Sequence, residues 1–144
     1  MVITETPSVS QLSQVISQAI APAFLLGALA AFISLLILRM NRVVDRSQSL
    51  NAIGDADPAR LRLKEDLPRL KQRAVLLNRA ILYASISAIF ATLLVMVAFV
   101  SAFFGIEHER GIAVLFIVNL GFFAAALINL ARETRIALHE FDYY

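Results

Sequence analysis

The chain has 144 residues, of which 59% are hydrophobic and 17% are charged, and its formal net charge is +2 at pH 7. Soluble domains carry about 45–50% apolar and about 25% charged residues, so this composition excludes an ordinary soluble globule. Because the chain has no cysteine, disulfides, zinc–thiolate sites, iron–sulfur clusters and a thiol nucleophile are also excluded. The length predicts a single domain, residues 1–144.

Three segments without a charged side chain predict three transmembrane helices: residues 19–38, 80–104 and 111–131. A helix needs about 20 mostly apolar residues to cross about 30 Å of hydrocarbon, and each segment is long enough. Three such runs leave too little polar surface for a water-soluble fold. The expected fold class is therefore an all-α integral membrane protein with three spans.

Residues 8–18 are polar but uncharged and lead into the first predicted span. One interpretation is an amphipathic helix that lies on the outer membrane surface. The other is an extension of the span whose Ser and Gln side chains line a vestibule around an oligomer axis. In that case the candidate pore-lining residues are Ser10, Gln14, Ser17 and Gln18.

Basic residues concentrate between the first and second spans, in residues 39–79. Ten of the 13 Lys and Arg residues lie there: Arg39, Arg42, Arg46, Arg60, Arg62, Lys64, Arg69, Lys71, Arg73 and Arg79. The segment 105–110 has only Arg110, and the tail, residues 132–144, has two arginines. By the positive-inside rule, residues 39–79 and the tail are expected in the cytoplasm, and the N-terminus and residues 105–110 outside.

The cytoplasmic segment 39–79 is predicted to be a helical hairpin. Its first helix continues from the first span through Ile53, and Gly-Asp-Ala-Asp-Pro, residues 54–58, ends it. Glycine suits the position just after a helix, Asp57 can cap the next helix, and proline suits the first helical position. A second helix is expected from Ala59 into the second span, with a kink or a late start near Pro68, because proline lacks a backbone donor.

Four arginines near the predicted membrane border are candidates for contacts with lipid phosphates or within the hairpin: Arg39, Arg42, Arg46 and Arg79. Basic segments beside a membrane gain about 1 kcal/mol per charge from anionic lipids. The simpler interpretation is that these residues obey the positive-inside rule and solvate the helix faces. No aromatic side chain lies among them before Tyr83, so no base-stacking surface and no nucleic-acid partner are expected.

Small and apolar residues at helix-packing intervals predict a homo-oligomer. Gly27 and Ala31 are four residues apart in the first span, and such pairs let helix backbones approach closely in lipid. In the hairpin, apolar residues alternate at steps of four and three, as in the seam of a coiled coil. The candidate oligomer contacts are Gly27, Ala31, Leu63, Leu67, Leu70 and Leu77.

Asn119 lies near the middle of the third span, where an unpaired amide would be costly. One interpretation is a hydrogen bond between helices, to Ser85, Ser87 or Ser34. The other is that Asn119 joins the pore-lining candidates and contacts an ion. The three spans contain no ionised side chain, which argues against a proton relay or a voltage sensor.

No arrangement of catalytic, metal-binding or cofactor-binding residues is found in the sequence. It has no metalloprotease helix, phosphate-binding glycine loop or Gly-x-Ser-x-Gly turn. The two histidines, His108 and His139, are expected on opposite sides of the membrane. The run from Glu107 to Glu109 is more typical of a short polar turn than of a metal site, because adjacent residues rarely converge on one ion. We therefore expect no enzyme, no metal and no cofactor.

The sequence contains four distinctive blocks: APAFLL (21–26), RMNRVVDRSQSL (39–50), RAVLLNRAILYASISA (73–88) and NLARETRIAL (129–138). These blocks resemble a bacterial membrane family catalogued as domain of unknown function twenty-seven twenty-one. The resemblance extends over about residues 10–140, and the Arg-x-x-Arg-x-x-Asp-Arg block is its most specific part. It implies a small bacterial integral membrane protein with the same three spans, in the plasma membrane. It implies no catalytic residue, substrate or cofactor.

Two functions remain open at this point. The favoured one is a homo-oligomeric ion-conducting pore, because three short spans cannot enclose a path within one chain and an uncharged polar face enters the first span. The alternative is a non-conducting scaffold or accessory subunit whose basic hairpin docks a cytoplasmic protein or anionic lipid. The partners expected in either case are membrane lipids and further copies of the chain.

Overall fold

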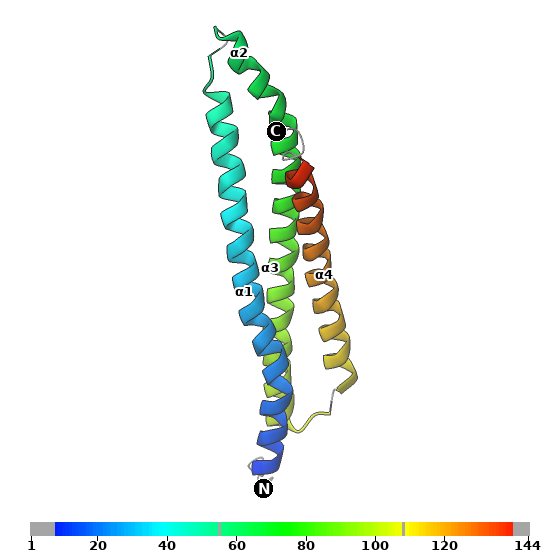
Figure 1. Ribbon diagram of the computed structural model, residues 1–144. Coiled ribbons are helices and arrows are strands. Elements are labelled where there is room, and N and C mark those ends of the chain that lie inside the picture. The colour runs from blue at the N-terminus through cyan, green and yellow to red at the C-terminus, as the bar shows by residue number, and fades with distance from the viewer. Residues whose placement is uncertain (1–7, 55, 108, 140–144) are drawn as a thin grey trace.

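The computed structural model describes residues 8–54, 56–107 and 109–139, and within them the chain is entirely helical (Figure 1). The elements are α1 (Val9–Asn51), α2 (Pro58–Leu61), the short 3₁₀ helix η1 (Arg62–Asp66), α3 (Leu67–Phe104) and α4 (Glu109–His139). Each predicted span lies within one of the three long helices. Among the described residues, α1, α4 and the run from Pro58 to Phe104 are long and apolar enough to cross a membrane. The expected all-α fold with three spanning helices is confirmed to that extent.

Helix α1 has 43 residues, which is about 64 Å at 1.5 Å per residue and twice the thickness of a bilayer core. Its N-terminus is closed by a capping box: the Ser8 hydroxyl accepts a hydrogen bond from the Gln11 backbone, and the Gln11 side chain accepts one from the Ser8 backbone. Pro22 lies within the helix, and its side chain is buried. Residues 9–18 therefore continue the first span in one helix, rather than forming a separate helix on the surface.

The chain reverses direction between α1 and α2. The Asp57 side chain caps α2 by accepting a hydrogen bond from the Ala59 backbone at 3.1 Å, and Pro58 occupies the first helical position, so both expectations are confirmed. Gly54 lies beyond the end of α1, which is closed by Ala52 instead.

The second helix of the hairpin starts late, which is one of the two outcomes expected near Pro68. It does not run unbroken from Ala59, because α2 and η1 precede α3, which begins one residue before Pro68. Proline would clash with the carbonyl of the residue four positions earlier in a continuing α-helix. The tighter 3₁₀ turn therefore lies on the N-terminal side of Pro68, and the late start is confirmed.

Helix α3 ends at Phe104 and is capped by Gly105, whose φ of 64° is the left-handed conformation that glycine adopts without strain. The Ile106 backbone then donates to the Ser101 carbonyl at 2.9 Å. This short turn makes α4 antiparallel to α3.

Helix α3 lies between the other two long helices in the view of Figure 1. It packs along both α1 and α4, whereas α1 and α4 touch each other only locally. One such place is an edge-to-face contact between Phe32 and Phe123, whose ring centroids are 5.4 Å apart. We call the end of the bundle at residues 52–66 the hairpin end and the end at residues 105–107 the loop end. At the hairpin end, α1 and α3 extend well beyond the end of α4 (Figure 1).

The core follows a seven-residue repeat on all three long helices. The buried positions in this repeat are Pro22, Leu29, Leu36, Val43 and Leu50 on α1; Leu70, Leu77, Ala84, Ala91 and Ala98 on one face of α3; Ala80, Ser87 and Leu94 on a second face of α3; and Asn119, Ala126 and Glu133 on α4. One further residue of α1, Ala19, is buried outside the repeat. A strict seven-residue period is the signature of left-handed coiled-coil packing. Helix α3 has two such faces because it packs against both neighbours.

The outer surface of the spans is apolar. In the most apolar stretch of each long helix, at most 22% of the residues are buried inside the chain. Large exposed side chains there include Phe24, Ile89, Ile117 and Ile128. Such a surface is stable in hydrocarbon and not in water, so the chain is a multi-pass membrane protein.

Candidate functional site

The centre of the candidate site is Glu133, a fully buried carboxylate on α4 near the hairpin end. Arg39 of α1 donates to its Oε2 atom from Nε at 3.0 Å and from Nη2 at 2.6 Å. Arg73 of α3 donates to its Oε1 atom from Nε at 2.8 Å. Each long helix therefore contributes one charged group, and one carboxylate is shared by two guanidinium groups.

The helix geometry places these three groups together. Glu133 continues the buried row of Asn119 and Ala126 on α4, and Arg73 precedes Ala80 by seven residues on the face of α3 that packs against α4. Arg39 lies one residue after the first predicted span, at the end of the apolar run on α1. The cluster therefore lies at the border of the apolar spans.

Among the described residues, the cluster has one negative and two positive charges. The Arg39 and Arg73 side chains keep 28% and 17% of their surface exposed, whereas Glu133 keeps none. A second acceptor, the Thr134 hydroxyl, lies 3.2 Å from Arg39 Nη2. An unpaired carboxylate at this depth would be strongly destabilised, so the two arginines compensate its desolvation and connect α4 to both other helices.

A second polar layer lies deeper in the spans. The Ser87 hydroxyl of α3 donates to the side-chain oxygen of Asn119 on α4 and lies 3.1 Å from the Asn119 backbone carbonyl. Both residues are fully buried. The expected hydrogen bond between helices is therefore present, with Ser87 as the partner. The Asn119 Nδ2 atom is buried without a hydrogen-bond partner among the described residues.

The two polar layers share one antiparallel register. From Ser87 back to Arg73 is 14 residues on α3, and from Asn119 to Glu133 is 14 residues on α4. The layers are thus two repeats, or about 21 Å, apart along the helices. By the same register Ala80 faces Ala126 between them, and both alanines are fully buried.

The pore-lining candidates of α1 lie at the loop end. Gln14 and Gln18, with Gln11, line a hollow of about 340 Å³ between α1 and the α3–α4 turn. Ser10 and Ser17 are exposed and do not line it, and the Ser10 hydroxyl forms a hydrogen bond with the Ser8 hydroxyl at 2.9 Å. These side chains are therefore separate from Asn119, which lies inside the α3–α4 packing.

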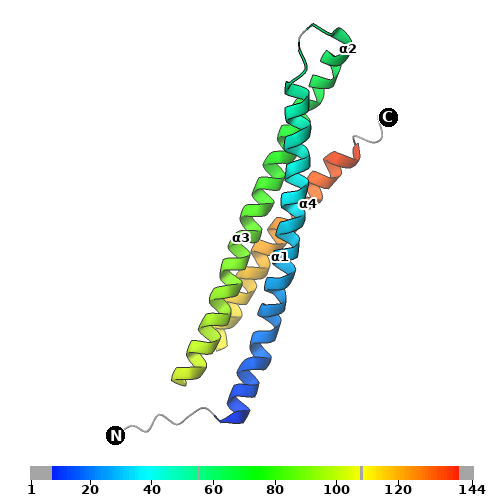
Figure 2. The ribbon, with the colours of Figure 1, turned by 90° about the vertical axis from the view of Figure 1, so that its left-hand side faces the viewer.

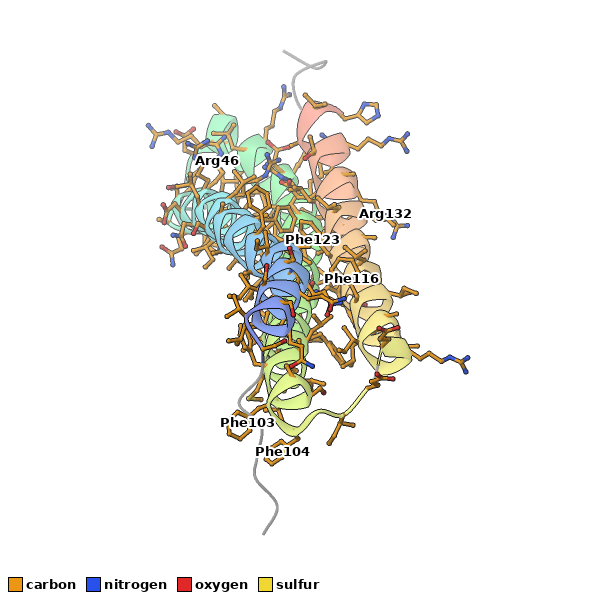
Figure 3. The ribbon with its side chains drawn as sticks, turned by 90° about the horizontal axis from the view of Figure 1, so that it is seen from below. Arg46, Phe103, Phe104, Phe116, Phe123 and Arg132 are labelled. Carbon is orange, nitrogen blue, oxygen red and sulfur yellow. The ribbon has the colours of Figure 1, made fainter. Side chains whose placement is uncertain are left out.

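The four arginines chosen as lipid or hairpin contacts have different environments. Arg39 belongs to the Glu133 cluster. Arg42 and Arg46 are exposed on α1 (Arg46 in Figure 3). Arg79 lines a groove between α3 and α4.

The oligomer candidates also separate into two groups. Leu70 and Leu77 are buried inside the chain, in the packing between α3 and α1, where a second copy cannot reach them. Gly27, Ala31 and Leu63 are exposed, and Leu67 is half-buried. The coiled-coil seam predicted from Leu63 to Leu77 is thus largely a contact between helices of one chain.

Glu133 follows the third predicted span and belongs to the segment expected as the cytoplasmic tail, so no buried role was predicted for it. The available signal was the seven-residue spacing from Asn119 through Ala126 to Glu133. Within the described residues there is no group of three or more metal-ligating side chains; His108 lies outside the described residues.

A family model described as "Protein of unknown function (DUF2721)" matches residues 19–143. The chain therefore belongs to this family, as its sequence blocks indicated. No curated protein and no solved structure matches the chain.

Proposed function

We propose that this member of the DUF2721 family is a non-conducting scaffold of the bacterial plasma membrane, and that its hairpin docks a protein partner in the cytoplasm. The basic excess in residues 39–79 supports an orientation with the hairpin and C-terminus inside and the N-terminus outside. The observation that carries the proposal is that the polar groups buried in the spans are turned inward, toward one another.

The inward orientation argues against a conducting path along the spans. Ser87 and Asn119 bond to each other, and Glu133 bonds to two arginines of the same chain. The remaining surface of the spans is mostly large apolar side chains. A pore needs a wall that can replace an ion's hydration shell, and these groups are already engaged within one chain.

The hairpin offers the surface that a docking role requires. It projects beyond α4 (Figure 2) and carries Leu61 and Leu63, which are 37% and 36% exposed beside basic residues. Ten basic and five acidic residues occupy positions 39–79. An apolar centre with a basic rim fits a partner with an acidic rim, because complementary charges steer association.

A homo-oligomer remains part of the proposal. Gly27 and Ala31 lie on the exposed face of α1, and a Cβ atom added to Gly27 would meet no other atom within 4 Å. Small residues on an exposed helix face permit close contact with a helix of another copy.

One observation favours the pore as a second candidate. The hollow at the loop end is lined by Gln11, Gln14 and Gln18, and also by Glu107 and Glu109. Amide oxygens and carboxylates at a channel mouth attract cations. This hollow would form the entrance if several copies surrounded an axis.

The experiment that tests the scaffold combines ion flux with crosslinking. We expect vesicles containing the purified chain to show no ion flux above protein-free vesicles. In inside-out membrane vesicles, a photo-reactive residue at Leu63 should give a discrete protein adduct whose yield falls with added salt. The same residue at Ile128, exposed on the span, is the control and should give none. Flux that Gln14→Leu or Gln18→Leu abolishes would instead establish the pore.

A further inference from the structure

A groove of about 410 Å³ between α3 and α4 gathers basic side chains near the hairpin end. Arg79 reaches it from α3, and Arg132, Arg135 and His139 reach it from α4, around an apolar floor that includes Leu76 and Ile136. None of the described residues that line this groove is acidic. We call it the α3–α4 basic groove.

The charges of this groove are not neutralised within the described part of the chain. Arg39 and Arg73 share Glu133, but no hydrogen bond or ion pair within the described residues engages Arg79, Arg132 or Arg135. Arg132 is adjacent to Glu133 in the sequence, yet its side chain projects from the side of α4 (Figure 3). Within the described part of the chain, the bundle therefore has a neutralising carboxylate in its interior and, on its surface, a cluster of guanidinium groups that no described carboxylate pairs.

Helix direction brings these side chains together. Side chains on a helix lean toward its N-terminus. Because α3 and α4 are antiparallel, Arg79 leans toward the hairpin end, while Arg132 and Arg135 lean toward the loop end. All three thus approach the same level, at the border of the apolar spans, where lipid headgroups lie.

We infer that the α3–α4 basic groove binds the phosphate of an anionic phospholipid. Guanidinium groups bind phosphate oxygens in a bidentate manner, and basic pockets between transmembrane helices bind lipid headgroups. The apolar floor accommodates the start of the acyl chains, which a free phosphate lacks. This inference requires only that the chain spans a membrane, and it does not depend on the docking role of the hairpin.

Native mass spectrometry of the full chain in a neutral detergent tests this inference. The probes are phosphatidylglycerol, phosphatidylcholine and inorganic phosphate. We expect phosphatidylglycerol to bind in preference to phosphatidylcholine, and millimolar inorganic phosphate not to displace it. Each Arg→Gln change in the groove should weaken binding of phosphatidylglycerol about fivefold, which corresponds to about 1 kcal/mol per charge.

The matched comparison is between two double variants with equal loss of charge. Arg132→Gln/Arg135→Gln should weaken the binding of phosphatidylglycerol by more than about tenfold. Arg60→Gln/Arg62→Gln removes two exposed charges at the hairpin tip and should change it less than about twofold if the site is local. Equal losses in the two variants, equal binding of the two lipids, or displacement by inorganic phosphate would each overturn the inference. If the groove double variant fails to fold, single Arg132→Gln and Arg135→Gln variants decide, and unchanged binding in both would reject the groove.

Discussion

Arg73 and Glu133 are 60 residues apart in the sequence, yet the Nε atom of the arginine lies 2.8 Å from the Oε1 atom of the glutamate. This pair occupies the same register as Ser87 and Asn119, two repeats deeper in the bundle. Polar contacts in lipid are directional, whereas apolar contacts are equally good in several alignments. The two polar layers therefore fix the axial alignment of α4 along α3.

The Glu133 cluster gives the first prediction. Glu133→Gln should destabilise the bundle by about 3 kcal/mol, because two arginines lose their shared carboxylate. Unfolding in SDS, followed by circular dichroism, measures this loss. Asp45→Asn, which changes an exposed acid on α1, is the control and should stay within about 0.5 kcal/mol of wild type.

Replacing all three charged residues of the cluster should lower the free energy of unfolding much less than replacing Glu133 alone. In the triple variant Arg39→Met/Arg73→Met/Glu133→Leu, no charge is left buried, and apolar replacement of such triads is often neutral or stabilising. We expect the same unfolding measurement to return this variant to within about 1 kcal/mol of wild type. A triple variant as unstable as Glu133→Gln would contradict the electrostatic interpretation.

The Ser87–Asn119 layer is tested by a double-mutant cycle. Ser87→Ala and Asn119→Ala each remove the side-chain hydrogen bond. The double variant should therefore lose less free energy of unfolding than the sum of the two single variants, with a coupling energy of about 0.6–1.7 kcal/mol. Asn119→Ala should be the milder single change, because it also removes the unpartnered Nδ2 atom. Additive losses would show that the two groups do not interact in the membrane.

The sequence predicted the helices well because length and hydrophobicity determine them. The three spans, the Asp57 cap and the late start of α3 at Pro68 all follow from local rules. The register between the helices does not follow from local rules, because it depends on which faces of the three helices meet. The seven-residue row of α4 is hard to recognise because it runs from an apolar span into a charged tail. The buried position of Glu133 was not predicted for this reason, and Arg39 was predicted to contact a lipid phosphate or another residue of the hairpin rather than Glu133.

The Ala80–Ala126 layer predicts a sensitive packing position. Both residues are fully buried, so Ala126→Leu should force α3 and α4 apart and cost about 1–3 kcal/mol. It should also weaken the flanking Ser87–Asn119 hydrogen bond, so a double-mutant cycle at these two residues in the Ala126→Leu background should show a smaller coupling. Leu127, exposed on the same helix, provides the control: Leu127→Ala should have a much smaller effect.

The membrane orientation can be tested with single cysteines, because the chain has none of its own. In intact cells, a membrane-impermeant maleimide should label Ser10→Cys and should not label Arg60→Cys. Both positions are exposed, so a difference in labelling reports the side of the membrane. Opening the cells should make Arg60→Cys reactive. The opposite labelling pattern would reverse the proposed topology.

The exposed small face of α1 gives the last prediction. Within one chain there is room for a side chain at Gly27, because an added Cβ atom meets nothing within 4 Å. Gly27→Leu should therefore leave the fold of the single chain intact, and replacing a glycine within a helix should even favour the helical state by up to about 1 kcal/mol. If another copy packs closely against this face, the same change should shift the oligomer toward the monomer, as measured by native mass spectrometry or light scattering in mild detergent. Val44→Ala, on an exposed part of α1 beyond the first span, is the control and should not alter the mass. An unchanged oligomer in Gly27→Leu would place the contact elsewhere, and a monomeric wild type would rule it out.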